Sequence, residues 1–151
     1  MDIGSKKGYP SSALSNFSPH PFMFEGIECA SMEGLLASFK FKDSNVQVEV
    51  CKLVGLKAKY RGKKRNKAWK RIQTLWWMHK EYKRDSDEYQ DLLDRAYNAL
   101  AKNTKFQKAL LATGRAVLKH SMGSSDMSNT VLTRSEFCSR LTKIRERLKN
   151  E

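Results

Sequence analysis

Cysteine, acidic residues and long apolar runs are scarce in this chain of 151 residues, and each scarcity excludes a class of protein. The cysteines number three (Cys29, Cys51 and Cys138), and no two of them form a C-x-x-C pair. Three widely spaced cysteines argue against a disulfide framework or a zinc ribbon, so we expect reduced thiols. No run is long enough to cross a membrane, and the first residues lack the apolar core of a signal peptide. We therefore expect a soluble, cytoplasmic protein with no membrane partner.

Familiar metal and catalytic spacings are also missing. His79 and His120 each stand alone on a helical segment, without a second ligand at metal spacing, which favours packing or surface roles. Ser121 has no G-x-S-x-G context and does not indicate a serine hydrolase. We expect neither a metal nor another cofactor.

Positive charge is what the chain has in excess. Lys and Arg number 29 against 16 Asp and Glu, which gives a net charge of +13. Such an excess favours phosphate-bearing partners, without choosing among them. The 40% apolar content predicts a folded globule, and the length suits one domain. We expect residues 1–12 to be a flexible lead and residues 13–151 to form the domain.

Local patterns predict an α+β fold that is mostly helical, with a small N-terminal β-sheet or hairpin packed on helices. Residues 22–29 read as two short strands around a Glu25-Gly26 turn. Ser31 suits the N-cap of a helix that ends near residues 42–44. Residues 46–60 fit both strand and helix periodicity, and their length favours a helix.

The second half of the chain reads as helices joined by polar loops. Residues 61–67 predict a basic loop, and residues 121–129 a loop rich in Gly and Ser. A capping-box pattern at residues 133–136 opens the last helix. The other helices are expected over residues 68–82, from Ser86 or Asp87 to Leu100, and over residues 105–119.

Glu33 and Lys40 are the most informative pair of residues in the sequence. Seven residues separate them, which is nearly two helical turns, so their side chains project from almost the same face. A carboxylate and an amine on one half-buried face can form a plain ion pair, or an acid/base and nucleophile pair. Spacing alone favours the ion pair.

The order of several motifs resembles the NADAR (YbiA-like) family. The resemblance is carried by Leu14-Ser15-Asn16-Phe17-Ser18-Pro19, Pro21-Phe22, Gly26 and Ser31-x-Glu33-x6-Lys40-Phe41, and more loosely by Trp69, Phe106, Ala109–Gly114 and Ile144–Leu148. The chain departs from the family at Gly34, where His is common, and at Ala37-Ser38, where Gln is common. In the late loop only Asp126 remains of an Asp-x-x-Trp-Gly segment. We expect a divergent branch, of phage type.

The resemblance implies an N-glycosidase that cleaves a ribose C1–N bond without a metal. NADAR proteins act on ribosylamino pyrimidines of the riboflavin pathway, or remove ADP-ribose from guanine bases. Glu33 would be the acid and base, and Lys40 a nucleophile whose pKa must be lowered before it forms a Schiff base. The candidate substrate-binding residues are Asn16, Phe17, Trp69 and Asp126. Turn formation by Asn16 and Asp126 and core packing by Trp69 are the structural alternatives.

Basic residues cluster between Lys57 and Arg71, with Tyr60 and Trp69 interleaved. The candidate phosphate-binding residues are Lys59, Arg61, Lys63, Lys64 and Arg65. They predict contacts to the phosphate of an ADP-ribosyl or ribosyl-phosphate substrate, or to DNA or RNA carrying a modified guanine, and a solvated helix face is the alternative.

Two functions therefore stay open: the N-glycosidase, and a non-catalytic nucleic-acid-binding module on the same fold. One cleft holding Glu33, Lys40 and Asn16 together would support the enzyme. Placement of the three side chains on separate surfaces would exclude it.

Overall fold

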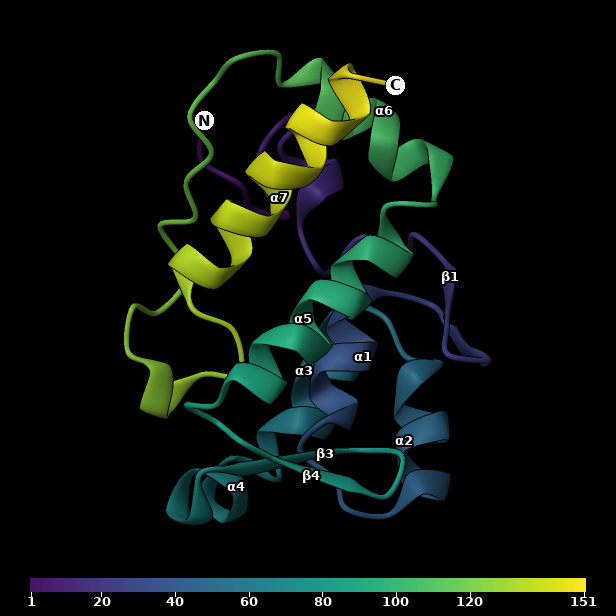
Figure 1. Ribbon diagram of the computed structural model, residues 1–151, viewed down its shortest axis with the longest axis vertical. Coiled ribbons are helices and arrows are strands. Elements are labelled where there is room, and N and C mark those ends of the chain that lie inside the picture. The colour runs from purple at the N-terminus through teal and green to yellow at the C-terminus, as the bar shows by residue number, and fades with distance from the viewer.

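Seven α-helices and two separate two-stranded antiparallel sheets make up the fold in the computed structural model, which describes all 151 residues (Figure 1). The helices are α1 (Met32–Ser38), α2 (Ser44–Cys51), α3 (Gly55–Lys63), α4 (Asn66–Ile72), α5 (Asp87–Leu100), α6 (Thr104–Ala112) and α7 (Arg134–Lys149). The strands are β1 (Phe22–Phe24), β2 (Ile27–Cys29), β3 (Thr74–Trp77) and β4 (Lys80–Lys83), and short 3-10 helices are η1 (Ser12–Leu14) and η2 (Met127–Asn129). The expected single α+β domain is confirmed. None of the helices combines the length and apolarity that a membrane crossing requires.

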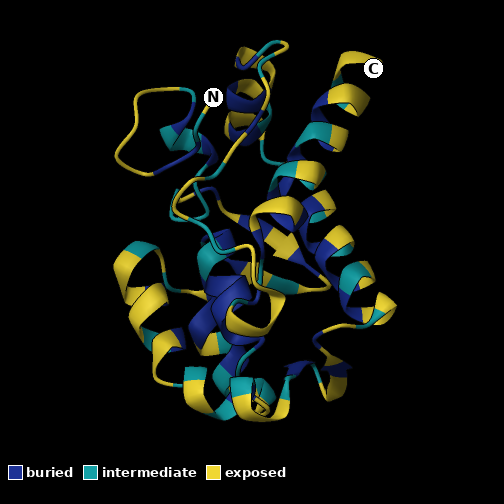
Figure 2. Ribbon diagram, turned by 90° about the vertical axis from the view of Figure 1, so that its left-hand side faces the viewer, coloured by how far each residue is buried: buried dark blue, intermediate teal, exposed yellow.

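Helices α1 and α5 supply much of the core. In α5 the buried side chains recur with helical spacing, and they are Tyr89, Leu92, Leu93, Ala96, Tyr97 and Leu100. In α1 every residue is buried except Glu33, so this helix runs through the protein interior (Figure 2). Burying the apolar side chains of such helices is the main favourable term in folding. Glu33 thus projects from an otherwise buried helix.

Several local predictions are confirmed. Strands β1 and β2 pair antiparallel around Glu25-Gly26, where both residues have the positive φ that a tight turn requires. The Ser31 hydroxyl accepts a hydrogen bond from the Gly34 amide at 3.1 Å and caps α1. Thr133 and Glu136 form the predicted capping box at the start of α7.

The basic stretch is more helical than expected. The single helix predicted over residues 46–60 is wrong, because the chain turns after Cys51 and restarts as α3 at Gly55, whose φ is +55°. Residues 61–67 are not a loop either, since α3 continues to Lys63 and α4 begins at Asn66.

The helix predicted over residues 68–82 is also wrong. Helix α4 stops at Ile72 because Gln73 takes a left-handed conformation, with φ of 50°. An antiparallel hairpin of β3 and β4 follows. All four residues of β3 are buried, so this strand has no alternation of apolar and polar residues, and its sequence mimics a helix.

Two other expectations differ from the structure. The helix predicted over residues 105–119 ends at Ala112, and Gly114, with φ of 61°, turns the chain away. The expected flexible lead of residues 1–12 is packed instead: Ile3 is fully buried, and Asp2 forms a parallel bridge with Lys119. The N-terminal segment therefore belongs to the folded domain.

Gln47 joins the end of α1 to the β3–β4 hairpin. Its buried amide nitrogen donates to the carbonyls of Phe41 at 2.9 Å and Trp76 at 2.8 Å, and its oxygen accepts from the Met78 amide at 3.1 Å. A buried amide with satisfied donors and acceptor fixes the segments that it contacts. The backbone just after Lys40 is held in this way.

A buried ion pair joins β4 to α7. The Arg84 guanidinium donates to both carboxylate oxygens of Glu136, at 3.1 and 2.6 Å, and its Nε donates to the Thr130 carbonyl at 2.8 Å. Burial alone raises the pKa of Glu136, but hydrogen bonds from Arg84, Thr133 and Gln90 outweigh it and hold the pKa at about 2. The pair thus fixes the loop before α7 to the rest of the protein.

Removing one partner of this pair leaves a buried charge without compensation. We expect Glu136→Ala to lower the free energy of unfolding by about 3–5 kcal/mol at pH 7. The contribution of Glu136 is complete above the carboxyl's ordinary pKa of 4.5 and is lost as the pH falls toward 2, so the deficit of the variant shrinks in acid. Urea denaturation at several pH values measures this. Exposed Glu146 is the control, and an equal loss in Glu146→Ala would contradict the assignment.

Candidate functional site

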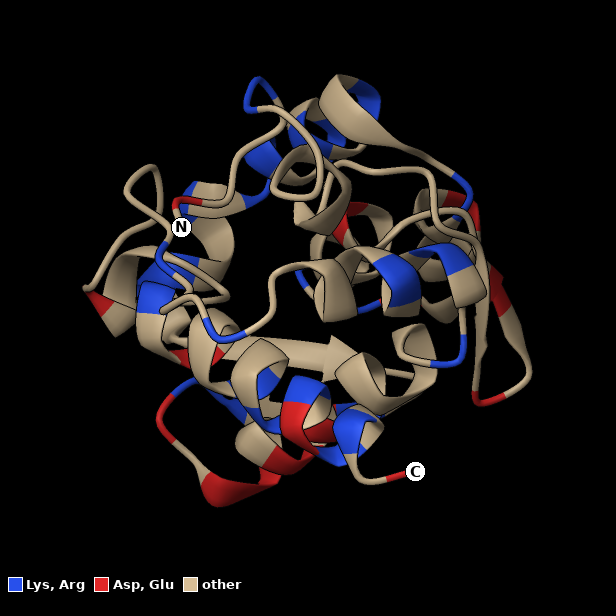
Figure 3. Ribbon diagram, turned by 90° about the horizontal axis from the view of Figure 1, so that it is seen from above, with Lys and Arg blue, Asp and Glu red and all other residues tan.

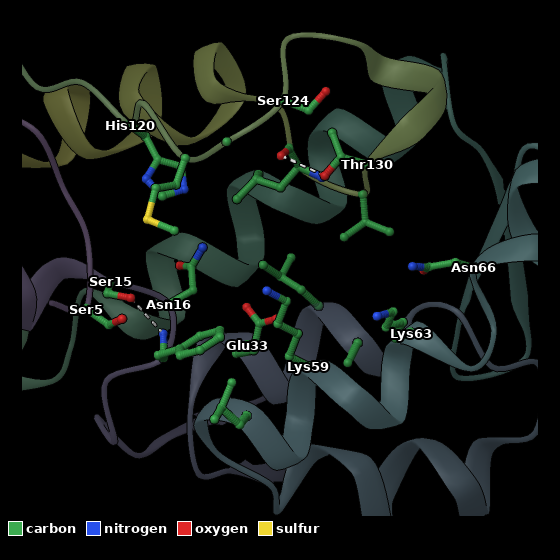
Figure 4. A pocket seen from close by; sticks show the side chains of 18 of the residues that line it. Ser5, Ser15, Asn16, Glu33, Lys59, Lys63, Asn66, His120, Ser124 and Thr130 are labelled. Atoms are coloured by element: carbon green, nitrogen blue, oxygen red, sulfur yellow. Dashed lines mark hydrogen bonds between the residues drawn. The ribbon is translucent and has the colours of Figure 1, made fainter.

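One pocket of about 630 Å³ opens between α1, α3, α4, the N-terminal segment and the loop before α7 (Figure 4). It brings together Glu33, Lys40 and Asn16, the three residues whose common location was required for the enzyme interpretation. Phe17, Trp69, Lys59 and Lys63 also line it. The pocket therefore contains seven of the candidate site residues that the sequence had singled out.

Glu33 reaches the pocket from the first turn of α1. Its backbone amide donates to the Asn16 carbonyl at 2.9 Å, which couples the start of α1 to the Ser-Asn-Phe segment. Its carboxylate makes no hydrogen bond with another side chain and no ion pair within 4.0 Å. Burial raises the pKa of Glu33, and the positive charges of Lys40 and Lys59 counter this only in part. The carboxyl group is thus free and binds a proton more readily than usual.

Lys40 lies just beyond the end of α1, since that helix stops earlier than predicted. Its Nζ donates to Asn66 Oδ1 at 2.8 Å rather than to Glu33. Burial lowers the pKa of Lys40 to about 8, although the charge of Glu33 acts in the opposite direction, and Lys70 lowers it further. The amine therefore loses its proton much nearer to physiological pH than an ordinary lysine does.

Two glycines allow the close packing around this pair. A Cβ on Gly62 would lie 3.0 Å from Ala37 Cβ and 3.3 Å from Lys40 Nζ. A Cβ on Gly34 would lie 2.7 Å from the Leu53 carbonyl oxygen, so a histidine does not fit where the NADAR pattern has one. This departure has a steric reason and leaves Glu33 in place.

Asn16, Phe17 and Trp69 occupy different parts of the wall. Asn16 Oδ1 accepts a hydrogen bond from the Tyr97 hydroxyl at 2.8 Å, which fixes the amide. Phe17 is half-buried beside Lys59, whose Nζ lies 6.0 Å from the ring centroid. Trp69 is only 1% exposed, and its Nε1 donates to Asn66 Oδ1 at 3.2 Å. Trp69 therefore positions Asn66, and it has little surface on which a base could stack.

Asp126 does not line the pocket. Its carboxylate accepts hydrogen bonds from Ser128 and from Asn129 Nδ2, the latter at 2.7 Å, within its own turn. This is the turn-forming alternative that was left open for Asp126. Asn129, which the turn holds, does line the pocket.

The basic candidates divide into two groups. Lys59 and Lys63 line the pocket, whereas Arg61, Lys64 and Arg65 do not. The guanidinium groups of Arg61 and Arg65 lie 4.5 and 5.9 Å from the centroid of the Phe41 ring, so these two residues pack on Phe41, three residues beyond the end of α1.

Neither Asn66 nor His120 was among the site residues predicted from the sequence. Asn66 is the one residue between Arg61 and Lys67 that is neither basic nor glycine, which was the only available signal. His120 was assigned to packing or the surface, and it lines the pocket. The residues 4–6 and 129–132, which also line it, carried no recognisable motif.

The net charge of the protein is concentrated next to the pocket. Residues 50–80 contain eleven Lys and Arg and no Asp or Glu, which leaves 18 basic and 16 acidic residues elsewhere. None of these eleven forms an ion pair within 4.0 Å. By contrast, α7, which ends near the C terminus, carries both signs of charge (Figure 3).

Comparisons with known proteins agree with this fold. The family model described as bacteriophage protein GP30.3 matches residues 8–146. The chain is 36% identical over 150 residues to an uncharacterized 17.1 kDa protein of the Gp30-rIII intergenic region of Enterobacteria phage T4, and the match covers 98% of each protein. The chain belongs to the bacteriophage protein GP30.3 family. The phage type that we expected agrees with this assignment, whereas membership of the NADAR family stays a prediction.

The fold of this GP30.3 family member is also similar to a solved bacterial structure. The NMR structure of the E. coli protein YbiA matches 99% of this chain and 84% of its own, with a TM-score of 0.65 and 16% sequence identity. The expected YbiA-like fold is confirmed. At that identity the likeness concerns the fold alone, so the chemistry of the site depends on its residues.

A buried lysine of lowered pKa costs stability, so replacing it should stabilise the fold. We expect Lys40→Met to raise the free energy of unfolding by about 1–2 kcal/mol at pH 7, after the lost hydrogen bond to Asn66 is subtracted. The folded-state pKa of about 8 lies below the ordinary 10.5, so the advantage should disappear as the pH rises between these values. Urea denaturation measures it, with exposed Lys108→Met as the control. A destabilised Lys40→Met at pH 7 would contradict the desolvation argument.

Proposed function

We propose that this protein is an N-glycosidase that hydrolyses a ribose C1–N bond. The observation that carries the proposal is that Glu33 and Lys40 share one pocket with Asn16 and yet do not pair with each other. A structural ion pair would place the two head groups in contact. Two buried groups that form no ion pair with each other are instead suited to proton transfer and nucleophilic attack.

Lys40 is the proposed nucleophile. Its neutral amine adds to ribose C1, the C1–N bond breaks, and the departing nitrogen takes the proton of the Glu33 carboxyl. The C1–O4′ bond then breaks and opens the sugar ring, O4′ takes one proton from Nζ, and the C1–Nζ bond becomes a protonated imine. Burial favours both the protonated carboxyl and the neutral amine, so one environment prepares both groups.

Glu33 then acts as the base. A water molecule gives a proton to the Glu33 carboxylate and adds to C1 of the imine. The C1–Nζ bond breaks, the sugar leaves as an aldehyde, and Lys40 is again an amine. The net reaction consumes one water and releases the free sugar and the free amine or base.

The substrate class follows from the resemblance together with the lining of the pocket. The NADAR resemblance points to ADP-ribosylated guanine or a ribosylamino-pyrimidine phosphate, and both carry phosphate. Lys59 and Lys63, which line the pocket and have no acidic partner, are suited to that phosphate. Arg61 and Arg65 are left out of this role because they pack on Phe41.

Substitution of either catalytic candidate should abolish turnover. We expect Glu33→Gln and Lys40→Ala each to slow sugar release by at least about 10²-fold, the usual contribution of a positioned acid or base. The assay incubates the protein with ADP-ribosylated guanine in DNA, and separately with the ribosylamino-pyrimidine phosphate. Borohydride trapping followed by mass spectrometry should locate a sugar adduct on Lys40.

Exposed neighbours provide matched controls. Lys42→Ala and Glu49→Gln remove the same charges outside the pocket and should leave the rate unchanged.

The rate should also depend on pH, because the active form holds one proton on the Glu33–Lys40 pair, with Glu33 protonated and Lys40 neutral. Above the Lys40 pKa of about 8 the pair loses this proton and the acid is missing, so the rate should fall. In acid, below the raised pKa of Glu33, the pair holds two protons and the amine is no longer a nucleophile, so the rate should fall again. Full activity of Lys40→Ala, or no product from either substrate, contradicts the proposal.

A second candidate function is supported by the acid-free basic stretch. The face that α3 and α4 present next to the pocket could bind a nucleic-acid backbone without any catalysis. Lys57, Lys64 and Lys67 are exposed members of this face and do not line the pocket. They therefore allow nucleic-acid binding to be tested separately from the chemistry.

Neutralising these three lysines should reduce the salt dependence of binding to a short single-stranded DNA. The slope of log K against log salt should become shallower by roughly 2, because each lost phosphate contact contributes about 0.7 for a single strand. Fluorescence anisotropy across a salt series measures this slope. Replacement of Lys102, Lys105 and Lys108, near and on α6, is the control that matches the charge change. Equal slopes for the two triple variants would contradict a binding role for this face.

A further inference from the structure

His120 is held in the pocket wall by three separate contacts. Its Nδ1 lies 2.9 Å from the Ile3 carbonyl oxygen, and its ring packs edge-on against Phe137 with centroids 5.1 Å apart. A Cβ on Gly123 would lie only 2.6 Å from His120 Cδ2, so the absence of a side chain there makes room for the ring. These contacts fix the orientation of the His120 ring.

The Ile3 contact fixes the tautomer of a neutral His120. A carbonyl oxygen can only accept a hydrogen bond, so Nδ1 must carry the proton. Nε2 is then an unprotonated acceptor, and it has no hydrogen-bond partner in the protein. The packed N-terminal segment thus decides what this histidine offers to the pocket.

Asn16 offers the complementary group. Its Oδ1 is occupied by the Tyr97 hydroxyl, which donates at 2.8 Å, so the Nδ2 donor remains available. Figure 4 shows Asn16 and His120 toward one end of the pocket, with Ser5 and Ser15, and Lys63 and Asn66 toward the other, with Glu33 between them. The pocket therefore has one end with a neutral donor and acceptor and another end with a cation.

We propose that Asn16 Nδ2 and His120 Nε2 form a recognition site for the edge of a nitrogen heterocycle, the group that leaves ribose C1. Such a base offers one hydrogen-bond acceptor and one N–H donor on neighbouring atoms, and the half-buried Phe17 and the Met122 side chain contact its faces. The inference rests on the proposed function for calling this group the leaving group. The sugar phosphate extends toward Lys63, at the other end of the pocket.

Neutral polar groups such as Asn16 and His120 discriminate between ligands through hydrogen bonding rather than through charge. A ligand that lacks either the donor or the acceptor leaves a protein group unpaired, and this penalty gives hydrogen-bonding sites their discrimination. Lys6 also lines the pocket near this end, but it is exposed to solvent and therefore attracts anions without reading a base edge. The specificity of the site is thus assigned to Asn16 and His120.

The experiment compares two ligands by calorimetry: guanosine 5′-monophosphate, which has the base edge, and ribose 5-phosphate, which lacks it. The unmodified protein should bind the nucleotide more tightly. His120→Ala and Asn16→Ala should each weaken nucleotide binding about 10-fold or more, and leave ribose 5-phosphate binding unchanged. Asn16→Ala removes the donor and adds no charge. His79→Ala, a histidine outside the pocket, is the control.

A second measurement does not depend on the folding of these variants. The imidazole ¹⁵N resonances of the unmodified protein should show His120 as the Nδ1–H tautomer, and guanosine 5′-monophosphate should shift Nε2 selectively. Gly123→Ala, which displaces the ring and keeps the imidazole, should weaken nucleotide binding in the same way as His120→Ala.

Three results would overturn the inference: the other tautomer, equal losses for both ligands, or equal affinity of the unmodified protein for the two. Because binding is measured without turnover, failure of the N-glycosidase assay leaves this test intact. If the His120→Ala protein keeps both its turnover and its nucleotide affinity, the proposed recognition site is contradicted and the N-glycosidase proposal stands.

Discussion

The site depends on the separation of Glu33 and Lys40 within one desolvated pocket. Each group feels the charge of the other, as their shifted pKa values show, but the Lys40 amine is held by Asn66 and the Glu33 carboxylate has no partner. An ion pair would satisfy both charges and stabilise both charged forms. Separation instead leaves the carboxyl inclined to hold a proton and the amine inclined to lose one. That arrangement costs folding free energy, which supports the proposal that the two groups react.

The surrounding structure keeps the two groups apart. Glu33 is fixed at the start of α1 by the Ser31 cap and by the bond from its amide to Asn16, while Gln47 fixes the backbone just beyond Lys40. On the opposite wall, Arg84 and the Tyr89 hydroxyl bind the carbonyls of Thr130 and Val131. The positions of both walls are thus set by buried hydrogen bonds rather than by contacts between the catalytic candidates.

Local signals in the sequence were sufficient for part of this fold. The β1–β2 turn, the Ser31 cap and the Thr133 capping box are each encoded within a few residues, and all three were predicted. The β3–β4 hairpin was not, because a strand buried on both faces shows no alternation and Trp76-Trp77 fits a helix equally well. The end of α6 was missed because Gly114 acts through its backbone conformation, which periodicity does not report.

The candidate site shows the same limit. Glu33, Lys40 and Asn16 could be found because their order resembles a known pattern. Asn66 is 26 residues from Lys40, His120 is 117 residues from the Ile3 carbonyl that orients it, and neither residue belongs to that pattern. Only the packing of α4 and of the N-terminal segment brings them to the pocket.

The lost Asp-x-x-Trp-Gly segment bears on how the pocket is walled. The Asp126 carboxylate accepts hydrogen bonds only within its own turn. Thr130 and Val131, which line the pocket, are held through their backbone carbonyls by Arg84 and Tyr89. A wall fixed in this way presents few reactive side chains, so recognition has to come from the other elements. In this chain those elements are the Ser-Asn-Phe segment, the packed N-terminus with His120, and the acid-free helices α3 and α4. The fold is YbiA-like, and the residues that we propose to set the selectivity of its pocket lie partly in the Ser-Asn-Phe motif and partly outside the motifs through which the resemblance was found.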